Sequence, residues 1–276
     1  LAIEKGSKFL LGVKLAGPIF KSLRDQSGLS SLRLMISGGA ALKPEVAEAF
    51  ESFGFTLFQG YGLTETSPIV SVNPHEKYKH KSIGVPIEDV EVEIDSPNET
   101  GEGELKVRGP IVMKGYYKNQ AATDEVIKNG WFYTGDIGYK DKEGYLYISG
   151  RKKAIIVTEA GKNVYPEELE EKLCESNMIE EALVIPVINN QSRREEVGAI
   201  IYPNPELIES VMKKNKSEED TEKELRDIIK EVINTVSEGV ADYKRIKHFE
   251  IRYEEFPKTT TKKIKRYLFI NKHINS

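Results

Sequence analysis

The spacing of apolar residues near the N-terminus predicts a strand, a helix and a second strand. Leu32–Ser37 is a short apolar run followed by a turn, which predicts a buried strand, and Phe55–Gly62 predicts another that ends in a glycine loop. Between them, Pro44 suits the first turn of a helix and Gly54 its end. The apolar face expected for this helix consists of Val46, Ala47, Ala49, Phe50 and Phe53. Strand, helix and strand over this length predict a parallel α/β unit.

The pattern changes near Ser82 to alternation of apolar and polar residues. The segments VEVEI, GELKVRG and YLYISG alternate and are separated by turn clusters, so they predict an antiparallel β part, as a small barrel or folded sheet. A second change follows the SGRKK segment. There, a helix predicted from Pro166 is followed by strands ALVIPV and VGAIIYP, the amphipathic helix EKELRDIIKEVINTV and the strand RIKHFEI.

These changes of pattern predict two domains with a boundary near residue 150. Residues 1–150 contain an α/β part (1–80) and a β-rich part (81–150), and residues 151–276 form a smaller α+β domain. The predicted fold class is therefore mixed α/β and α+β.

Charge and cysteine content narrow the function classes. With 40 basic and 44 acidic residues the net charge is −4, which argues against general nucleic-acid binding. No uninterrupted apolar run approaches the ~20 residues that a membrane span needs. Cys174 is the single cysteine, which excludes a disulfide within the chain and favours a reducing, cytoplasmic location. The four histidines lack metal-ligand spacing.

The segment Phe9–Gln26 predicts a helix interrupted at Gly17 and Pro18. Its basic residues leave a peripheral contact with a membrane surface open. A solvated helix face is the simpler interpretation.

Two glycine motifs follow the predicted N-terminal strands. ISGGAAL places Gly38, Gly39 and Ala40 after the first strand, where paired glycines allow a ligand to approach the backbone or simply make a tight turn. The second motif, QGYGLTET, follows the strand at the end where α/β sheets place ligands. It contains Gln59, Gly60, Tyr61, Gly62, Thr64 and Glu65.

The residue types of QGYGLTET suit a nucleotide. Its glycines would leave backbone amides open, Tyr61 offers a ring to a base, Thr64 a hydroxyl to a phosphate, and Glu65 a carboxylate to Mg²⁺. A polar loop with an N-cap threonine is the competing interpretation, and the spacing leaves both open.

Two further places carry candidate chemistry. Asp136, in GWFYTGD, and Arg151, after the next hairpin, could bind both hydroxyls of a ribose by hydrogen bonds. An aspartate that satisfies a turn explains Asp136 without a ligand.

Near the C-terminus, FPKTTTKKIKRYLF carries five cations in an acidic chain. A lysine there could neutralise two anions that repel each other, because an ammonium is a compact charge on a flexible stem. A solvated basic tail is the alternative. The cations are Lys258, Lys262, Lys263, Lys265 and Arg266.

Six motifs in this order resemble the adenylate-forming superfamily of acyl-CoA synthetases, luciferases and peptide-synthetase adenylation domains. They run from about Leu29 to Arg266 and are ISGGAAL, QGYGLTET, GELKVRGP, GWFYTGD, GRKKAIIVTEAGKNVYPEELE and FPKTTTKKIKR. IFKSLRDQSGLSSLRLMISGGAAL and TEAGKNVYPEE look most like long-chain fatty-acid CoA ligases. The resemblance implies that a fatty acid reacts with ATP to give acyl-adenylate, and that coenzyme A then displaces AMP.

The resemblance also implies roles for individual residues. Gly38, Gly39 and Ala40 would border adenine and the acyl pocket, and Gln59 to Gly62 would line the nucleotide site, with Tyr61 against adenine. Thr64 would bind the α-phosphate, Glu65 would bind Mg²⁺, and Asp136 and Arg151 would bind the ribose. Lys263 would compensate negative charge during catalysis.

In this family the small C-terminal domain rotates between the two half-reactions. The hinge would fall at Lys153. After rotation the TEAGKNVYPEE loop, with Gly161, would line the passage for the pantetheine of coenzyme A.

The sequence departs from the family pattern at two places. Lys262 stands where the family usually has glycine, so we expect strain if that position requires a positive φ. In addition, residues 1–31 contain nothing like the family's Ser/Thr/Gly-rich phosphate loop. We therefore expect the chain to be the C-terminal portion of a longer enzyme, inactive or nearly so alone. Exposed strand edges and apolar patches would favour self-association.

Two other functions fit the same sequence. One is a non-catalytic protein that binds a nucleotide or acyl-CoA and has lost the phosphate loop. The other is an acyl-adenylating enzyme that loads a carrier-protein thiol instead of coenzyme A. Sequence preceding Leu1 that contained the phosphate loop would favour an enzyme, and CoA-dependent thioester formation would separate the ligase from the carrier-loading enzyme.

Overall fold

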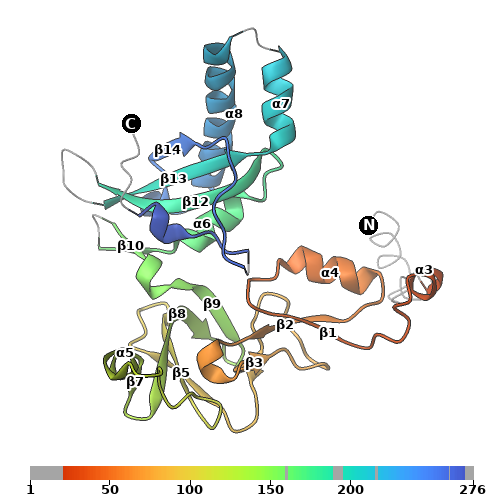
Figure 1. Cartoon of the computed structure of the whole chain (residues 1–276), viewed down its shortest axis with the longest axis vertical. Coiled ribbons are helices and arrows are strands. Elements are labelled where there is room, and N and C mark those ends of the chain that lie inside the picture. Colours follow the sequence, from red (N-terminus) through yellow and green to blue (C-terminus); the bar gives the residue numbers. More distant parts are fainter. Residues whose placement is uncertain (1–20, 159–160, 189–194, 215–216, 261, 271–276) are drawn as a thin grey trace. The chain divides into compact units, whose positions relative to one another are not determined.

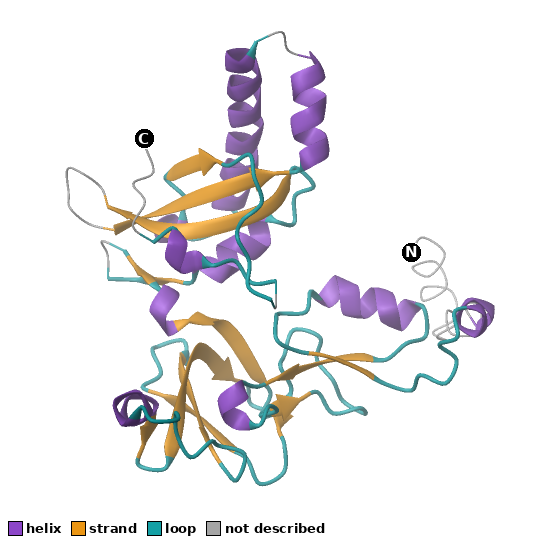
Figure 2. Ribbon diagram, viewed as in Figure 1, coloured by secondary structure: helices purple, strands orange, loops and turns teal. Residues whose placement is uncertain are grey.

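The computed structural model describes residues 21–158, 161–188, 195–214, 217–260 and 262–270. Most of the segment considered for membrane contact lies outside these residues. The chain divides into two compact units, Leu1–Ile148 and Ser149–Ser276, which are taken one at a time below. Figure 1 labels the elements, and Figure 2 shows that both units mix helices with strands.

The N-terminal part of the first unit is a four-stranded sheet with helices. Its strand order is β1-β2-β3-β4, and β1 is parallel to β2 with Met35 opposite Leu57. Helix α4 lies between these two strands in the sequence, so the predicted parallel strand–helix–strand unit is confirmed. The elements are α3 (Lys21–Gln26), β1 (Met35–Ser37), α4 (Pro44–Ser52), β2 (Leu57–Tyr61), η1 (Thr64–Thr66), β3 (Ser71–Val72) and β4 (Val85–Pro86).

Proline begins α4 as predicted, but two expectations about burial are wrong. The predicted buried strand over residues 32–37 is shorter, and Ile36 is 55% exposed, because β1 is the edge strand of its sheet. Of the predicted apolar face of α4, only Ala47 is buried, whereas Val46, Phe50 and Phe53 are exposed.

The rest of the first unit is an antiparallel sheet, as the alternation predicted. Its order is β5-β6-β8-β7, and β9 also pairs with β8. Its inward residues, including Val92, Leu105, Val107 and Leu146, form one core cluster with Val70. The elements are β5 (Glu91–Asp95), β6 (Gly103–Arg108), α5 (Gln120–Val126), β7 (Ile127–Lys128), β8 (Trp131–Lys140) and β9 (Leu146–Arg151).

The second unit is built on the sheet β12-β13-β14, in which β13 is antiparallel to β12 and parallel to β14. Its core joins Leu169 and Leu173 of α6 to Val184, Ile201 and Ile229. The elements up to β13 are η2 (Lys152–Ala154), β10 (Ile156–Val157), β11 (Asn163–Val164), α6 (Pro166–Leu173), β12 (Ile179–Ile188) and β13 (Glu195–Pro203). The others are α7 (Pro205–Lys214), α8 (Glu218–Glu238), η3 (Asp242–Lys244), β14 (His248–Ile251) and η4 (Arg266–Leu268).

Helix α6 begins at Pro166, as predicted, and α8 covers the predicted amphipathic helix with Leu225, Ile229 and Ile233 buried. Helix α7, which runs beside α8 in Figure 1, was not predicted. None of the helices among the described residues combines the length and apolar character that a bilayer crossing requires.

Candidate active site

The structure brings the two glycine motifs together at the ends of β1 and β2. Ser37 pairs with Gln59, and a Cβ added to Gly38 would lie 3.4 Å from the carbonyl oxygen of Gly60. Gly39 has a φ of 84°, which strongly favours glycine. Both motifs therefore lie at the carboxyl ends of parallel strands, where α/β sheets bind ligands. Gly38, Gly39 and Ala40 are exposed there.

The second motif is more tightly packed than the sequence suggested. Gln59 is buried, and Gly60 and Tyr61 belong to β2, which pairs with β3. At Gly62 an added Cβ would lie only 1.7 Å from the carbonyl oxygen of Pro68. The chain therefore folds back onto itself at Gly62, and this contact requires glycine whether or not its amide meets a ligand.

Thr64 and Glu65 lie in the short 3₁₀ helix η1, which its third residue holds in place. Thr66 is buried, and its hydroxyl accepts from the Leu63 N–H at 3.0 Å and donates to the Leu63 carbonyl at 3.0 Å. Thr64 is exposed, so its hydroxyl is accessible.

A residue that the sequence analysis missed contacts Glu65. The hydroxyl of Tyr116 donates to Oε1 of Glu65 at 2.9 Å, and the Met113 N–H donates to the Glu65 carbonyl at 2.8 Å. Partial burial raises the pKa of Tyr116, and the Glu65 carboxylate raises it further, so Tyr116 remains a donor at neutral pH. The only signal was the GYY triplet downstream of GELKVRGP.

Glu65 suits Mg²⁺ only if the nucleotide supplies further ligands. Among the described residues, no group of three or more histidine, cysteine or acidic side chains could hold a metal ion. Mg²⁺ is commonly bound through one or two carboxylates together with substrate phosphates and waters. A single carboxylate at position 65 therefore fits a magnesium–nucleotide complex and does not fit a metal site made by protein alone.

The second and third motifs meet through one short hydrogen bond. The hydroxyl of Tyr61 donates to Oδ2 of Asp136 at 2.5 Å, and the N–H of Asp136 donates to Oγ1 of Thr134 at 3.0 Å. Asp136 is only 4% exposed. The structure thus places the candidate adenine ring contact and one candidate ribose ligand side by side.

The other predicted residues belong to the second unit. Arg151 ends β9 and Lys153 lies in η2, and both are exposed. Gly161 has a φ of 67° in the turn between β10 and β11, where its N–H donates to the Thr158 carbonyl at 2.8 Å. Two residues of the predicted pantetheine loop, 159 and 160, lie outside the described residues.

Lys263 is exposed in a loop that also contains the expected strain. Lys262 has a φ of 63°, in the left-handed region that favours glycine, so the expectation of strain at this departure from the family pattern is confirmed. Thr261 lies outside the described residues.

Two members of the C-terminal basic cluster are bound to carboxylates, which was not expected. Lys258 forms an ion pair with Glu181, and Arg266 forms one with Glu170. The alternative of a solvated basic tail is therefore wrong for these two residues, whose side chains are only 26% and 21% exposed.

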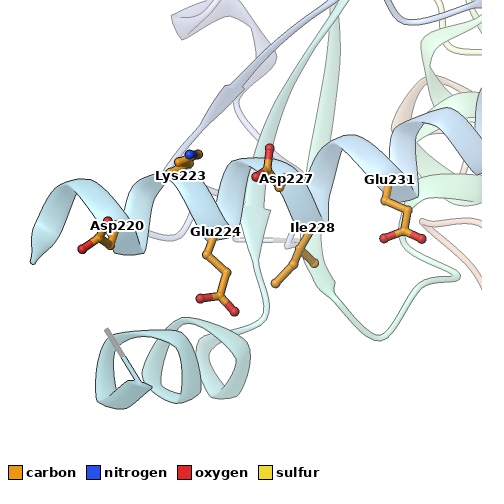
Figure 3. Close-up of a pocket in the computed structure, with 6 residues that line it drawn as sticks. All are labelled: Asp220, Lys223, Glu224, Asp227, Ile228 and Glu231. Carbon is orange, nitrogen blue, oxygen red and sulfur yellow. The ribbon is translucent and has the colours of Figure 1, made fainter. Parts of the chain in front are cut away.

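A surface pocket of the second unit contains none of the predicted site residues (Figure 3). It lies on α8 and is lined by Asp220, Lys223, Glu224, Asp227, Ile228 and Glu231. Its four carboxylates would repel the phosphates of a nucleotide, so it offers no alternative site for ATP.

Comparisons with known proteins agree with the motifs. A Bacillus subtilis (strain 168) protein named long-chain-fatty-acid–CoA ligase is 40% identical over 247 residues, which cover 86% of this chain and 40% of the relative. The chain therefore spans less than half the length of this curated relative. The o-succinylbenzoate CoA synthetase MenE of B. subtilis, solved with its acyl-adenylate intermediate, superposes with a TM-score of 0.73 at 26% identity over 94% of this chain and 51% of MenE.

The same synthetase in complex with ATP and magnesium ion gives a TM-score of 0.69 at 26% identity, over 92% of this chain and 50% of that one. These structures confirm the predicted mixed fold class. The AMP-binding enzyme model matches residues 11–117, and the AMP-binding enzyme C-terminal domain model matches residues 153–275. Together the two models account for most of the sequence in the family's order, and the chain belongs to the AMP-binding enzyme family.

Proposed function

We propose that this chain is the C-terminal portion of a long-chain fatty acid–CoA ligase. The complete enzyme activates a fatty acid with ATP to acyl-adenylate and pyrophosphate, and then transfers the acyl group to the thiol of coenzyme A. The observation that carries the proposal is the hydrogen bond between Tyr61 and Asp136, because it joins two motifs distant in sequence whose residue types suit adenine and ribose. Relatives named for this activity support it.

In the proposed first step the nucleotide lies at the ends of β1 and β2. Tyr61 presents its ring to adenine, Asp136 and Arg151 bind the ribose hydroxyls, and Thr64 donates to the α-phosphate. Glu65 holds the magnesium ion of the ATP complex, which neutralises phosphate charge. Gly38 to Ala40 leave the backbone accessible beside the nucleotide and the acyl group. A side chain at position 39 would disfavour this backbone conformation, because Gly39 has a positive φ.

Lys263 supplies the charge that the first step needs. The carboxylate and the α-phosphate are both anionic, so their approach is opposed by repulsion that a nearby ammonium removes. The carboxylate oxygen then attacks the α-phosphorus, and the bond to the pyrophosphate oxygen breaks. Among the described residues the Lys263 side chain makes no ion pair, so its charge is available for this role.

In the proposed second step the C-terminal unit turns about Lys153. The turn containing Gly161 then lines the path of the pantetheine arm, and the CoA sulfur attacks the acyl carbonyl with AMP as leaving group. One small domain thereby serves both half-reactions.

Pyrophosphate release with ATP, Mg²⁺ and palmitate tests the first half of the proposal, and CoA-dependent thioester formation tests the second. We expect both activities from the complete enzyme and neither from the 276 residues alone, which lack a phosphate loop for the β- and γ-phosphates. Turnover by the 276 residues at the rate of the complete enzyme would contradict the expected inactivity. Thioester formation only on a carrier protein would identify a carrier-loading enzyme instead.

The lysine has its own test in the complete enzyme. Lys263→Ala is expected to lower adenylation by about 100- to 1000-fold, the loss typical of removing one preorganised electrostatic contact. Thioester formation from pre-made acyl-adenylate should persist. An equal loss of both half-reactions would refute the role given to Lys263.

A further inference from the structure

Lys263 lies in a loop whose shape is fixed by its own backbone. Lys258 and Ile264 form an antiparallel bridge, the Thr259 N–H donates to the Lys263 carbonyl at 2.8 Å, and the Lys263 N–H donates to Oγ1 of Thr259 at 3.2 Å. These contacts lie within the loop, so they do not determine where the loop points. Its direction is set by the contacts that tie its two ends to the rest of the second unit.

The first end is tied to β12 by Glu181. The ammonium of Lys258 pairs with Oε1 of Glu181, and Oε2 of the same carboxylate accepts the Phe256 N–H at 3.0 Å. One carboxylate thus holds both a side chain and the backbone of the segment that enters the loop.

The second end is tied by Arg266 to α6 and β12 together. Nη2 of Arg266 donates to both carboxylate oxygens of Glu170, at 2.7 and 2.8 Å, and Nη1 donates to the Val184 carbonyl at 2.6 Å. The Val184 N–H in turn donates to Oε1 of Glu170 at 2.7 Å. The Arg266 and Glu170 side chains are only 21% and 17% exposed. The chain leaving the loop is therefore held by a closed network of directed contacts.

Stability alone is a poor explanation for this network. Burial raises the pKa of the Glu170 carboxyl above its ordinary value, and Arg266 opposes that shift, so the ionised pair is maintained against a solvation cost. An apolar pair of similar volume could join α6 to β12 as well or better. It could not fix the angle of the backbone at Arg266, which the planar guanidinium does by bonding Glu170 and Val184 at once.

The same helix also touches the segment that carries the candidate ribose arginine. A Cβ added to Gly150 would lie 2.8 Å from Oε2 of Glu167, in the first turn of α6. Oε1 of Glu167 lies 4.0 Å from Nη2 of Arg266. Helix α6 therefore holds the Lys263 loop through Glu170 and packs against the residue that precedes Arg151.

We propose that Arg266 and Glu170 are positioning residues for adenylation: their partly buried, hydrogen-bonded ion pair fixes the exit of the 258–266 loop on α6 and so aims the Lys263 ammonium. The proposal rests on the proposed function, in which Lys263 serves the adenylation step. The proposed function gives neither residue a contact with substrate. Because the loop serves only that step, loss of the pair should affect one half-reaction.

The test uses two variants. Glu170→Gln removes the charge but keeps an acceptor for the Val184 N–H, and Arg266→Lys keeps the charge but loses the planar guanidinium that bonds Glu170 and Val184 at once. Lys265→Met is the matched control, because Lys265 is a neighbouring cation outside the network. Adenylation is followed by fatty-acid-dependent ATP–pyrophosphate exchange in the complete enzyme. Thioester formation is followed from pre-made acyl-adenylate and CoA. Amide hydrogen exchange of residues 258–266 in the 276-residue chain reports on the loop itself.

We expect both network variants to lower adenylation by about 10- to 100-fold, the range that a misplacement of about 1 Å can cause. Thioester formation should stay near the wild-type rate, exchange should quicken in the 258–266 loop alone, and Lys265→Met should resemble wild type. An equal loss of both half-reactions would show a merely structural pair and overturn the proposal. So would wild-type adenylation in both variants while Lys263→Ala abolishes it. If Lys263→Ala itself left adenylation intact, the role of Lys263 would fail first, and the positioning proposal with it.

Discussion

Tyr61 donates a hydrogen bond to Asp136 across 2.5 Å, although their strands, β2 and β8, belong to different sheets of the first unit. A carboxylate that is 4% exposed depends on protein donors for its solvation. The bond therefore fixes the orientation of Asp136 and of the Tyr61 ring together. If these two residues bind ribose and adenine, the protein has arranged both before the nucleotide arrives.

Tyr61→Phe is expected to lower the free energy of unfolding by about 1–3 kcal/mol, because it removes one donor from a buried carboxylate and leaves the ring in place. Urea denaturation of the 276-residue chain measures this loss. Tyr117→Phe is the matched control, since that ring is almost fully exposed. If Tyr61→Phe had the same free energy of unfolding as the wild type, the hydrogen bond to Asp136 would contribute nothing to the stability of the fold.

Local sequence signals were sufficient for the elements that they mark. Pro44 and Pro166 begin α4 and α6 as predicted, because a fixed φ and a missing N–H suit the first turn of a helix. Alternation predicted the antiparallel strands for an equally local reason. Helix α7 was missed because it has one buried residue, Val211, and runs into the charge-rich stretch that follows.

Contacts between distant elements could not be predicted in the same way. Arg266 stands in a basic run that looks solvated, and its partner Glu170 is one of several acidic residues in PEELEEKL. Nothing in either segment distinguishes this pair, because its choice depends on how α6, β12 and the C-terminal loop pack. Tyr116 was missed for a similar reason, since its partner Glu65 comes from another motif.

The turn at Asp141 should make stability depend on pH in the acid range. Burial raises the pKa of Asp141, but hydrogen bonds from Lys79, from the N–H groups of Tyr145 and Glu143 and from the Tyr147 hydroxyl outweigh it and lower the pKa to about 2, from an ordinary 3.8. A depressed pKa in the folded state stabilises the fold above the unfolded pKa. This contribution is complete well above pH 3.8 and is lost as the pH falls toward about 2.

Asp141→Asn therefore should lower the urea midpoint near neutral pH, and the difference from wild type should shrink as the pH falls below about 4. Glu99→Gln, at an exposed turn of the same unit, is the control for a lost charge. A difference that stayed constant across this range would contradict the lowered pKa.

The exposed apolar residues of β1 and α4 predict self-association of the chain. Ile36 is exposed on the edge strand β1, and Phe50 is exposed on α4. Unpaired backbone groups at a sheet edge and exposed apolar surface both favour binding of a second molecule. Light scattering should show a mass that rises with concentration, and Ile36→Thr combined with Phe50→Ser should reduce it. Met212→Gln, at an exposed apolar site on helix α7 of the second unit and not on an edge strand, should not. A monodisperse monomer in the wild type would refute the prediction.

Lys262→Gly is expected to stabilise the chain, although it removes a side chain next to the proposed catalytic lysine. A non-glycine residue at a φ of 63° costs about 1–2 kcal/mol, whereas glycine loses roughly 0.5–1 kcal/mol of additional chain entropy on folding. The balance favours the variant by about 0.5–1 kcal/mol.

Lys265→Gly is the matched control, because Lys265 has a φ of −75°, so glycine there relieves no left-handed backbone and brings the entropic loss. Urea denaturation should thus move the two variants in opposite directions. If Lys262→Gly were destabilised as much as Lys265→Gly, the left-handed backbone at position 262 would not be the conformation that the folded loop holds in solution.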